Sequence, residues 1–230
     1  MRLYNNLINE IKEHLISSKQ LVNGKLLNVS NKNSVILLSD TAFELGGSNK
    51  PCVSSLAVSS DIELSNSVYL LGSDLNEIKS DSPFAKFVFI QVKDFENEQD
   101  TFNKIKELEA LRYHLSVDGF MTRASALNMR EQIRVSKKAI KSGVTLADYG
   151  ETLLSKYLEF DYVKSAEIYF VTDFCDFDKL NVVAKKISQT TSALNHIFDN
   201  VMFDCSTCNL KEICDEVDGL KELHLKNVKN

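Results

Sequence analysis

The chain has 230 residues, 43% of them hydrophobic, and a formal net charge of −5. This length and apolar content are enough for one sizeable core or two small subdomains. Basic and acidic residues are well mixed, which argues against a nucleic-acid-binding face. The sequence has no apolar run of about 18 residues and no apolar signal core at its N-terminus, so we expect a cytoplasmic protein without a membrane partner.

The first half of the chain predicts one helix followed by short strands. Leucine and isoleucine recur every three or four residues in 3–22, which predicts an amphipathic helix that ends before Gly24. The chain then changes to short apolar runs that are rich in β-branched and aromatic residues. We expect strands at residues 26–29, 34–38, 52–58, 67–72 and 87–92, separated by turn residues at 46–49 and 80–83.

The second half is predicted to be mostly helical. Apolar residues at helical spacing predict helices over 98–117, 123–141, 145–158, 177–192 and 215–225, with Gly143 as a helix end and Thr145 as a cap. Residues 166–172 are typical of a strand. We therefore expect an α+β fold, with a helix plus a β-rich subdomain at residues 1–95. An α/β subdomain at residues 96–230 follows it, with a cysteine-rich metal segment at the C-terminal end.

Three cysteines near the C-terminal end carry the clearest chemical signal. Cys205, Cys208 and Cys214 have the spacing C-x2-C-x5-C. A Cys-x-x-Cys pair can turn two sulfurs toward one point, and a third thiolate shortly after can close on the same point. The chain has an odd number of cysteines, five, and in a reducing cytosol such crowding favours metal binding over disulfides. We therefore predict a soft-metal site with three thiolate ligands.

The identity of the metal and of the fourth ligand stays open at this point. Three cysteines can hold a [4Fe–4S] cluster that leaves one iron free for a further ligand. His224 is the best candidate for that ligand, and the resulting Cys3His set also matches structural zinc. A segment without metal is the third alternative. Cys52 and Cys175 are more typical of buried apolar positions, and the remaining histidines, His14, His114 and His196, suggest no common site.

Two segments resemble a known family. Residues 134–143 read RVSKKAIKSG and are similar to the RVSK-x-A-x-x-x-G stretch of acetyl-CoA synthase, the β subunit of the carbon monoxide dehydrogenase/acetyl-CoA synthase complex. Residues 43–47 read FELGG and resemble a family segment with an acidic residue just before paired glycines. The resemblance covers roughly residues 34–214, the part of the family that leads into its nickel–iron–sulfur A-cluster.

The resemblance implies a role for the cysteines and also a limit to that role. Cys205 and Cys208 match the C-x2-C pair that begins the family's [4Fe–4S] ligands, and Cys214 matches the third. The fourth cysteine and the later Cys-Gly-Cys nickel motif have no counterpart in this sequence, so we do not expect bound nickel. The resemblance implies an iron–sulfur accessory or redox subunit in anaerobic one-carbon and CO metabolism, without full synthase activity. A protein partner in a carbon monoxide dehydrogenase-like or other redox complex is expected with it.

The only dense basic stretch of the sequence offers a second candidate site. It contains the basic residues Arg112, Arg123, Arg130, Arg134, Lys137 and Lys138. Arg134 and Lys137 are the positions we assign to possible phosphate contacts, such as those of a coenzyme A-like ligand. The alternative is a solvated face that is balanced by neighbouring acids, including Glu131. No nucleophile–base triad can be recognised, so the sequence leaves open whether the protein is an enzyme.

Overall fold

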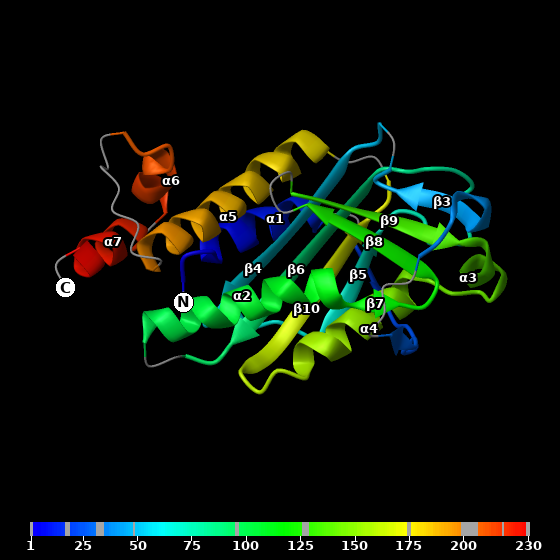
Figure 1. Ribbon diagram of the computed structural model, residues 1–230, viewed down its shortest axis with the longest axis horizontal. Helices are drawn as coiled ribbons and strands as arrows, with labels where there is room; N and C mark the ends of the chain where they lie inside the picture. The colour runs from blue at the N-terminus through cyan, green and yellow to red at the C-terminus, as the bar shows by residue number, and fades with distance from the viewer. Residues whose placement is uncertain are drawn as a thin grey trace.

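The computed structural model describes residues 2–16, 19–30, 35–47, 49–94, 97–125, 129–173, 176–198, 207–217 and 219–228. Figure 1 labels the elements. In chain order they are α1 (Asn5–Leu15), β1 (Gln20–Val22), β2 (Val29–Ser30), the 3-10 helix η1 (Leu38–Asp40), β3 (Thr41–Leu45), β4 (Cys52–Ser59), β5 (Ser67–Leu71), β6 (Phe84–Val92), α2 (Glu98–His114), β7 (Ser116–Val117), β8 (Phe120–Ser125), β9 (Arg130–Ser136), α3 (Lys137–Lys141), α4 (Leu146–Leu158), β10 (Val163–Val171), α5 (Phe177–Phe198), α6 (Lys211–Glu216) and α7 (Leu220–Val228).

Strand β10 lies in the middle of a five-stranded sheet whose order is β1-β5-β10-β6-β4. It runs parallel to β5 and antiparallel to β6, and Phe170 lies beside Leu70 and Lys86 in the register. β6 and β10 are buried along almost their whole length, because other layers cover both faces of the sheet. This mixed sheet with its helices confirms the α+β class. The strands expected at 52–58, 67–72, 87–92 and 166–172 are confirmed as β4, β5, β6 and β10.

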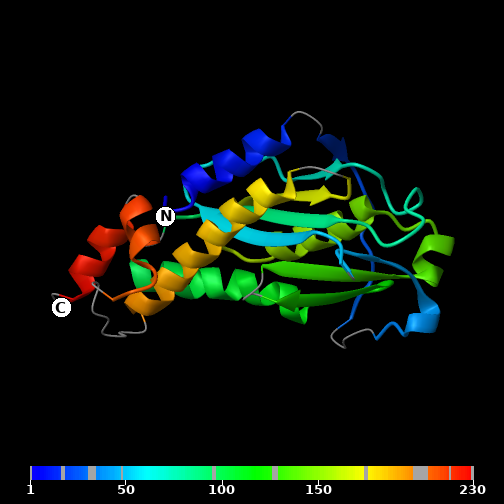
Figure 2. The same ribbon diagram turned by 90° about the horizontal axis from the view of Figure 1, so that it is seen from above.

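Helices α1 and α5 cover one face of this sheet and lie side by side (Figure 2). The hydroxyl groups of Tyr4 and Thr191 share a 2.9 Å hydrogen bond that ties the start of α1 to α5. Lys12 of α1 forms a 2.8 Å ion pair with Glu167 of β10. Because side chains alternate along a strand, Glu167 and Phe170 lie on opposite faces of the sheet.

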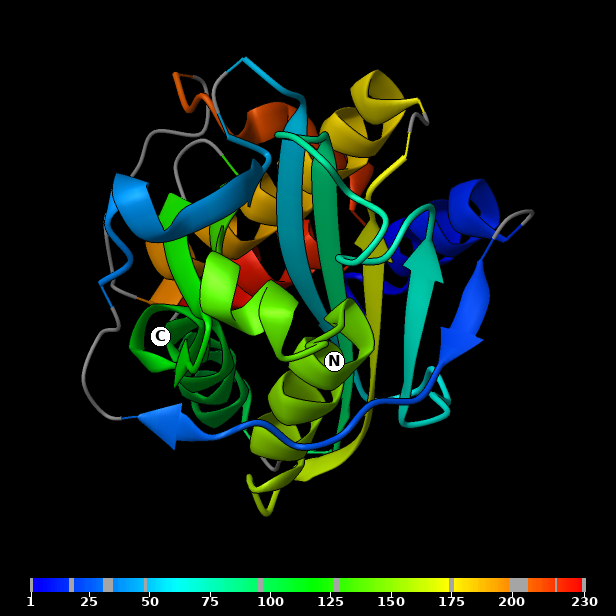
Figure 3. The ribbon, with the colours of Figure 1, turned by 90° about the vertical axis from the view of Figure 1, so that its right-hand side faces the viewer.

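Helix α4 and the three-stranded sheet β3-β9-β8 cover the other face (Figure 3). A Cβ atom at Gly150 would lie 2.5 Å from Cγ1 of Val68, so α4 rests directly on β5. The start of α4 is fixed by a capping box between Thr145 and Asp148, which confirms the expected cap. The helices expected over 98–117 and 177–192 are likewise confirmed as α2 and α5.

The expected helix over residues 123–141 is wrong. The structure has an antiparallel pair of strands, β8 and β9, there, and among the described residues of this range only Lys137–Lys141 are helical. Along β9, Ile133 and Val135 are buried while Gln132 and Arg134 between them are partly exposed. This two-residue period is that of a half-buried strand, and it prevails over the sparse helical spacing of the same apolar residues.

Two expectations near the N-terminus also need correction. The first helix ends at Leu15, and residues 20–22 form β1 at the edge of the central sheet, antiparallel to β5. Of the expected strand at 26–29, only Val29 is in a strand, β2. The expected strand at 34–38 is wrong for its described part, because residues 35–37 lie outside any element and Leu38 begins η1. Several apolar side chains of these two runs are exposed, so the runs do not contribute strands to the core.

The C-terminal segment folds as two helices that contact α5 at one end of the molecule, opposite the β3-β9-β8 sheet (Figure 1). The single helix expected at 215–225 is divided into α6 and α7, with Gly219 at φ +86° between them. Strands from both sides of the expected boundary near residue 95 pair in the central sheet. No helix in the described part of the chain is long and apolar enough to cross a membrane.

Candidate functional site

A small cavity lies where α6 and α7 meet the end of α5. Its volume is about 150 Å³, and its wall includes Cys208, Cys214, His196 and His224. We refer to it as the cysteine cavity. The rest of the wall consists of the apolar Ala193, Ile197 and Leu210 and the charged Lys211, Asp215 and Lys221. The cavity therefore presents thiol and imidazole groups beside both apolar and charged side chains.

Local contacts hold the two described cysteines in this wall. The backbone N–H of Leu210 donates to Sγ of Cys208 at 3.4 Å. The N–H of Cys214 donates to the carbonyl of Leu210 at 3.1 Å, in the first turn of α6. Ile213 is buried, and an ion pair between Lys186 and Glu216 joins α5 to α6. An N–H that points at sulfur stabilises negative charge there, which suits a thiolate ligand.

The structure brings together three of the four residues that the sequence assigns to a metal. Cys208, Cys214 and His224 line the same cavity, and Cys205 lies outside the described residues. Among the residues that are described, no three His, Cys, Asp or Glu side chains are placed so that they could hold a metal ion. The donor types fit a soft or borderline metal, and the third thiolate would have to come from Cys205.

The sequence analysis missed one residue of this cavity, His196. It lies in the last turn of α5, where the helix approaches α6 and α7. Its position just before the cysteine segment is the one signal that could have suggested it.

Cys52 lies away from the cysteine cavity, at the start of β4, where its thiol donates to the carbonyl of Glu131 at 3.5 Å. Burial raises the pKa of the Cys52 thiol, which is typical of an inert cysteine.

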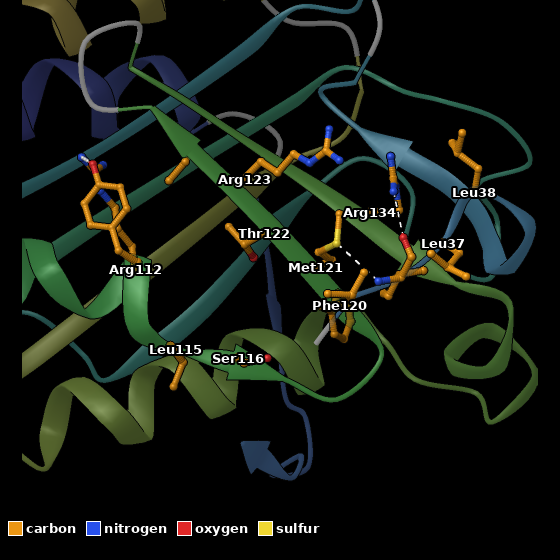
Figure 4. Close-up of a pocket in the computed structure, with 14 residues that line it drawn as sticks. Leu37, Leu38, Arg112, Leu115, Ser116, Phe120, Met121, Thr122, Arg123 and Arg134 are labelled. Carbon is orange, nitrogen blue, oxygen red and sulfur yellow. Dashed lines mark hydrogen bonds between the residues drawn. The ribbon is translucent and has the colours of Figure 1, made fainter. Parts of the chain in front are cut away.

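A second and larger cavity lies beside β8 (Figure 4). Its volume is about 620 Å³, and its wall includes Arg112 of α2, Arg123 of β8 and Arg134 of β9. We call it the arginine cavity. No aspartate or glutamate lies among the described residues that line it. The described wall therefore carries three guanidinium groups; Arg134 is paired with Glu44, Arg112 interacts with Glu109 and Glu131, and Arg123 is exposed.

The structure shows the contacts of the two residues that the sequence assigns to phosphate. Arg134 donates from Nε to Glu44 at 2.7 Å, and a second guanidinium nitrogen donates to the carbonyl of Ile36 at 2.8 Å. Lys137 donates from Nζ to the carbonyl of Ser39 at 2.8 Å and does not line the arginine cavity. Phosphate binding by either residue stays a prediction, and it would require them to exchange or share these partners.

The suggestion that Glu131 balances a solvated basic face is wrong, because this side chain is 1% exposed. Glu131 forms an ion pair with Lys86 of β6 and accepts a 3.1 Å hydrogen bond from the hydroxyl of Ser54. Burial lowers the pKa of Lys86, and the charge of Glu131 opposes that effect. The pair lines neither cavity and joins the two sheets.

Comparison with known protein families shows to which family the chain belongs. The sequence model of the CO dehydrogenase/acetyl-CoA synthase complex beta subunit matches residues 31–177, more than half of the chain. The protein belongs to this family. A search of curated proteins found no match. The matched region contains the arginine cavity and both segments that resemble the family, FELGG and RVSKKAIKSG, and it ends before Cys205. Family membership therefore rests on the sheet-forming body and is independent of the cysteine cavity.

Proposed function

We propose that this protein is an iron–sulfur-binding member of the acetyl-CoA synthase β-subunit family with an accessory or redox role. The observation that carries the proposal is that Cys208, Cys214 and His224 line one small cavity, although as described their side chains are not placed around a single ion. Three separate segments supply these residues: the residues before α6, α6 itself and α7. Thiolate and imidazole ligands together favour iron–sulfur clusters, zinc and copper over hard cations.

In this proposal Cys205, Cys208 and Cys214 are three thiolate ligands of a [4Fe–4S] cluster, and the imidazole of His224 is the fourth ligand. When bound, such a cluster supplies one-electron transfer. The chain's own residues support the site: the N–H of Leu210 donates to Sγ of Cys208, and Ala193, Ile197 and Leu210 supply the apolar part of the wall. The proposal does not include carbon–carbon bond formation, because these 230 residues contain no Cys-Gly-Cys motif.

The family relationship supports a partner protein. The family is named for the β subunit of a complex, and we infer that this chain also works within a complex of the carbon monoxide dehydrogenase kind or another redox complex. A cluster that carries electrons needs a donor or an acceptor close by, and a subunit of a complex meets that need. On the ground of the family relationship we also propose a role in anaerobic one-carbon and CO metabolism.

A structural zinc site is the second candidate. His224 shares the cavity with Cys208 and Cys214, and a Cys3His set with Cys205 is a common tetrahedral zinc site. Zinc would then join α6, α7 and the residues before α6 without a redox role. The two candidates use the same cysteines, so cysteine variants do not distinguish them. They are distinguished by the identity of the metal and by its absorption spectrum.

The test is the visible absorption of anaerobically purified protein and of two serine variants. We expect the broad sulfur-to-iron charge-transfer absorption in the wild type and its loss in Cys208→Ser. Cys52→Ser is the matched control, because Cys52 lies on β4 outside the cavity, and it should keep the absorption. A colourless wild type with bound zinc would favour the structural site. Retention of the absorption in Cys208→Ser would refute the ligand set.

A further inference from the structure

One edge of strand β8 has no neighbouring strand in the part of the chain that the structure describes. The sheet order is β3-β9-β8, so β8 is an edge strand. The N–H of Ser136 donates to the carbonyl of Gly119 at 2.9 Å, and the pairing continues in register from Phe120 with Val135. In an antiparallel ladder the hydrogen-bonded positions alternate. The backbone N–H and C=O groups of Thr122 and Ala124 therefore point away from β9.

This edge opens into the arginine cavity. Thr122 and Ala124 both line the cavity, as does Arg123 between them (Figure 4). Thr122 and Arg123 point to opposite faces of β8, as side chains of consecutive strand residues do. The cavity thus combines backbone donors and acceptors that pair with no other described strand with alternating side-chain positions. Those are the two elements with which a sheet edge recognises an added strand.

The rim of the cavity is apolar and exposed. Val35, Leu37, Leu38 and Tyr113 are 75%, 61%, 78% and 43% exposed, and all four line the cavity. Nine large hydrophobic side chains are exposed in the described part of the chain, and these are four of them. Such clustering at one place is typical of an interaction surface, whereas single exposed apolar residues are ordinary.

The charge of the cavity indicates what kind of segment fits. Arg123 is exposed and makes no hydrogen bond or ion pair with any described residue. The Nε atom of Arg112 is buried, and no acceptor for it is found among the described residues. Arg134, in contrast, is paired with Glu44. Arg112 also interacts with Glu109 and Glu131, so Arg123 is the guanidinium group of this wall that favours an acidic partner.

We propose that the free edge of β8 is a docking site for an extended, acidic segment of a partner protein. The segment adds as a strand, and its backbone pairs with the outward groups of Thr122 and Ala124. A carboxylate of the segment pairs with Arg123, and its apolar side chains contact apolar side chains of the cavity wall, such as Tyr113. A small phosphate-bearing ligand could use the arginines, but it would leave the backbone edge and the apolar rim without a role. This proposal is independent of any metal at the cysteine cavity.

The test uses synthetic peptides of about ten residues, the upper end of common strand lengths. The first alternates valine with glutamate and is blocked at both ends. The second alternates valine with lysine. The third repeats the first with every backbone nitrogen methylated, which removes its hydrogen-bond donors. Binding is measured by fluorescence anisotropy, and amide hydrogen exchange at Thr122 and Ala124 is followed by NMR in the same samples.

We expect the valine–glutamate peptide to bind and to slow exchange at both amides, and the methylated peptide not to bind. Arg123→Glu should weaken binding of the acidic peptide about tenfold and shift preference to the valine–lysine peptide. Lys164→Glu makes the same charge change at an exposed position of β10 and should leave binding unchanged. Circular dichroism checks that both variants fold.

Four outcomes of the peptide measurements would overturn the proposal. They are equal binding of the methylated peptide, unchanged binding by Arg123→Glu, unchanged amide exchange at Thr122 and Ala124, and no binding of any peptide. If inorganic pyrophosphate alone shifts the Arg123 signals while the peptides do not bind, the cavity is a site for small anions. If sedimentation shows that two copies of the chain pair through β8, the occupant is a second copy and the proposed partner segment is wrong.

Discussion

Lys86 of β6 and Glu131 of β9 form an ion pair that is closed off from solvent between the two sheets, with exposures of 3% and 1% for their side chains. Ser54 of β4 donates a further hydrogen bond to Glu131. A buried pair of this kind contributes little net stability by itself, but either partner alone would be a buried and uncompensated charge.

We expect Lys86→Met to lower the free energy of unfolding by about 3–5 kcal/mol, because it leaves the Glu131 carboxylate buried without its cation. The double variant Lys86→Met with Glu131→Gln should recover a large part of this loss. Urea denaturation measures both. The control is Lys104→Met at the half-exposed pair with Glu107, where a loss below about 1 kcal/mol is expected. An equal loss for the buried and the exposed variants would contradict the packing of β9 on β6.

The ion pair between Lys12 and Glu167 predicts a dependence of stability on pH. Burial by itself raises the pKa of Glu167, but hydrogen bonds from Lys12, Tyr169 and Ser65 outweigh it and hold the pKa below its ordinary value of 4.5. A depressed carboxyl pKa contributes stability above the unfolded value, and this contribution is lost as the pH falls through the folded value. The free energy of unfolding should therefore decrease below about pH 4.5. Glu167→Gln should flatten that decrease, and an unchanged pH profile would show that Glu167 does not take part.

The close approach of α4 to the central sheet can be tested at Gly150. A Cβ atom there would lie 2.5 Å from Val68 and 2.9 Å from Phe170. Gly150→Ala should lower the free energy of unfolding by about 1–3 kcal/mol, although alanine is the better helix former. Ser155→Ala, a change on the same helix, is the control and should have a small effect. A stabilised Gly150→Ala protein would mean that α4 lies farther from β5.

His224 can be tested as a metal ligand separately from the cysteines. His224→Ala should speed the loss of metal to a chelator about tenfold or more, whether His224 is a direct ligand or supports one. His114→Ala, at an exposed histidine of α2, should not change it. If His196→Ala has the large effect and His224→Ala has none, the fourth ligand comes from α5.

The parts of the fold that were predictable from the sequence are those with one dominant signal. β6 and β10 are continuous β-branched and aromatic runs, because they are buried on both faces. α4 has its cap at Thr145. The strand pair of β8 and β9 was missed because Ile133 and Val135 fit a sparse helical spacing as well as a two-residue period. Pairing of β9 with β3 in the fold favours the strand over the helix.

The candidate sites also contain some residues that could be predicted from the sequence and others that could not. The cysteine spacing predicted a common site for Cys208 and Cys214, and both line the cysteine cavity, while their binding of a metal stays a prediction. His196 comes from another helix, so only the fold brings it to the same wall. The arginine cavity combines residues of α2, β8 and β9, which are far apart in the sequence. The free edge of β8 could not be predicted, because the sequence analysis did not identify β8 as a strand.

The central claim is that the cysteine cavity holds an iron–sulfur cluster. Its most direct test is the content of iron, acid-labile sulfide and zinc in protein purified and reconstituted without oxygen. The account predicts about four iron and about four sulfide per chain, as a [4Fe–4S] cluster requires, with little zinc. Protein that carries one zinc, or no metal after reconstitution, would contradict it.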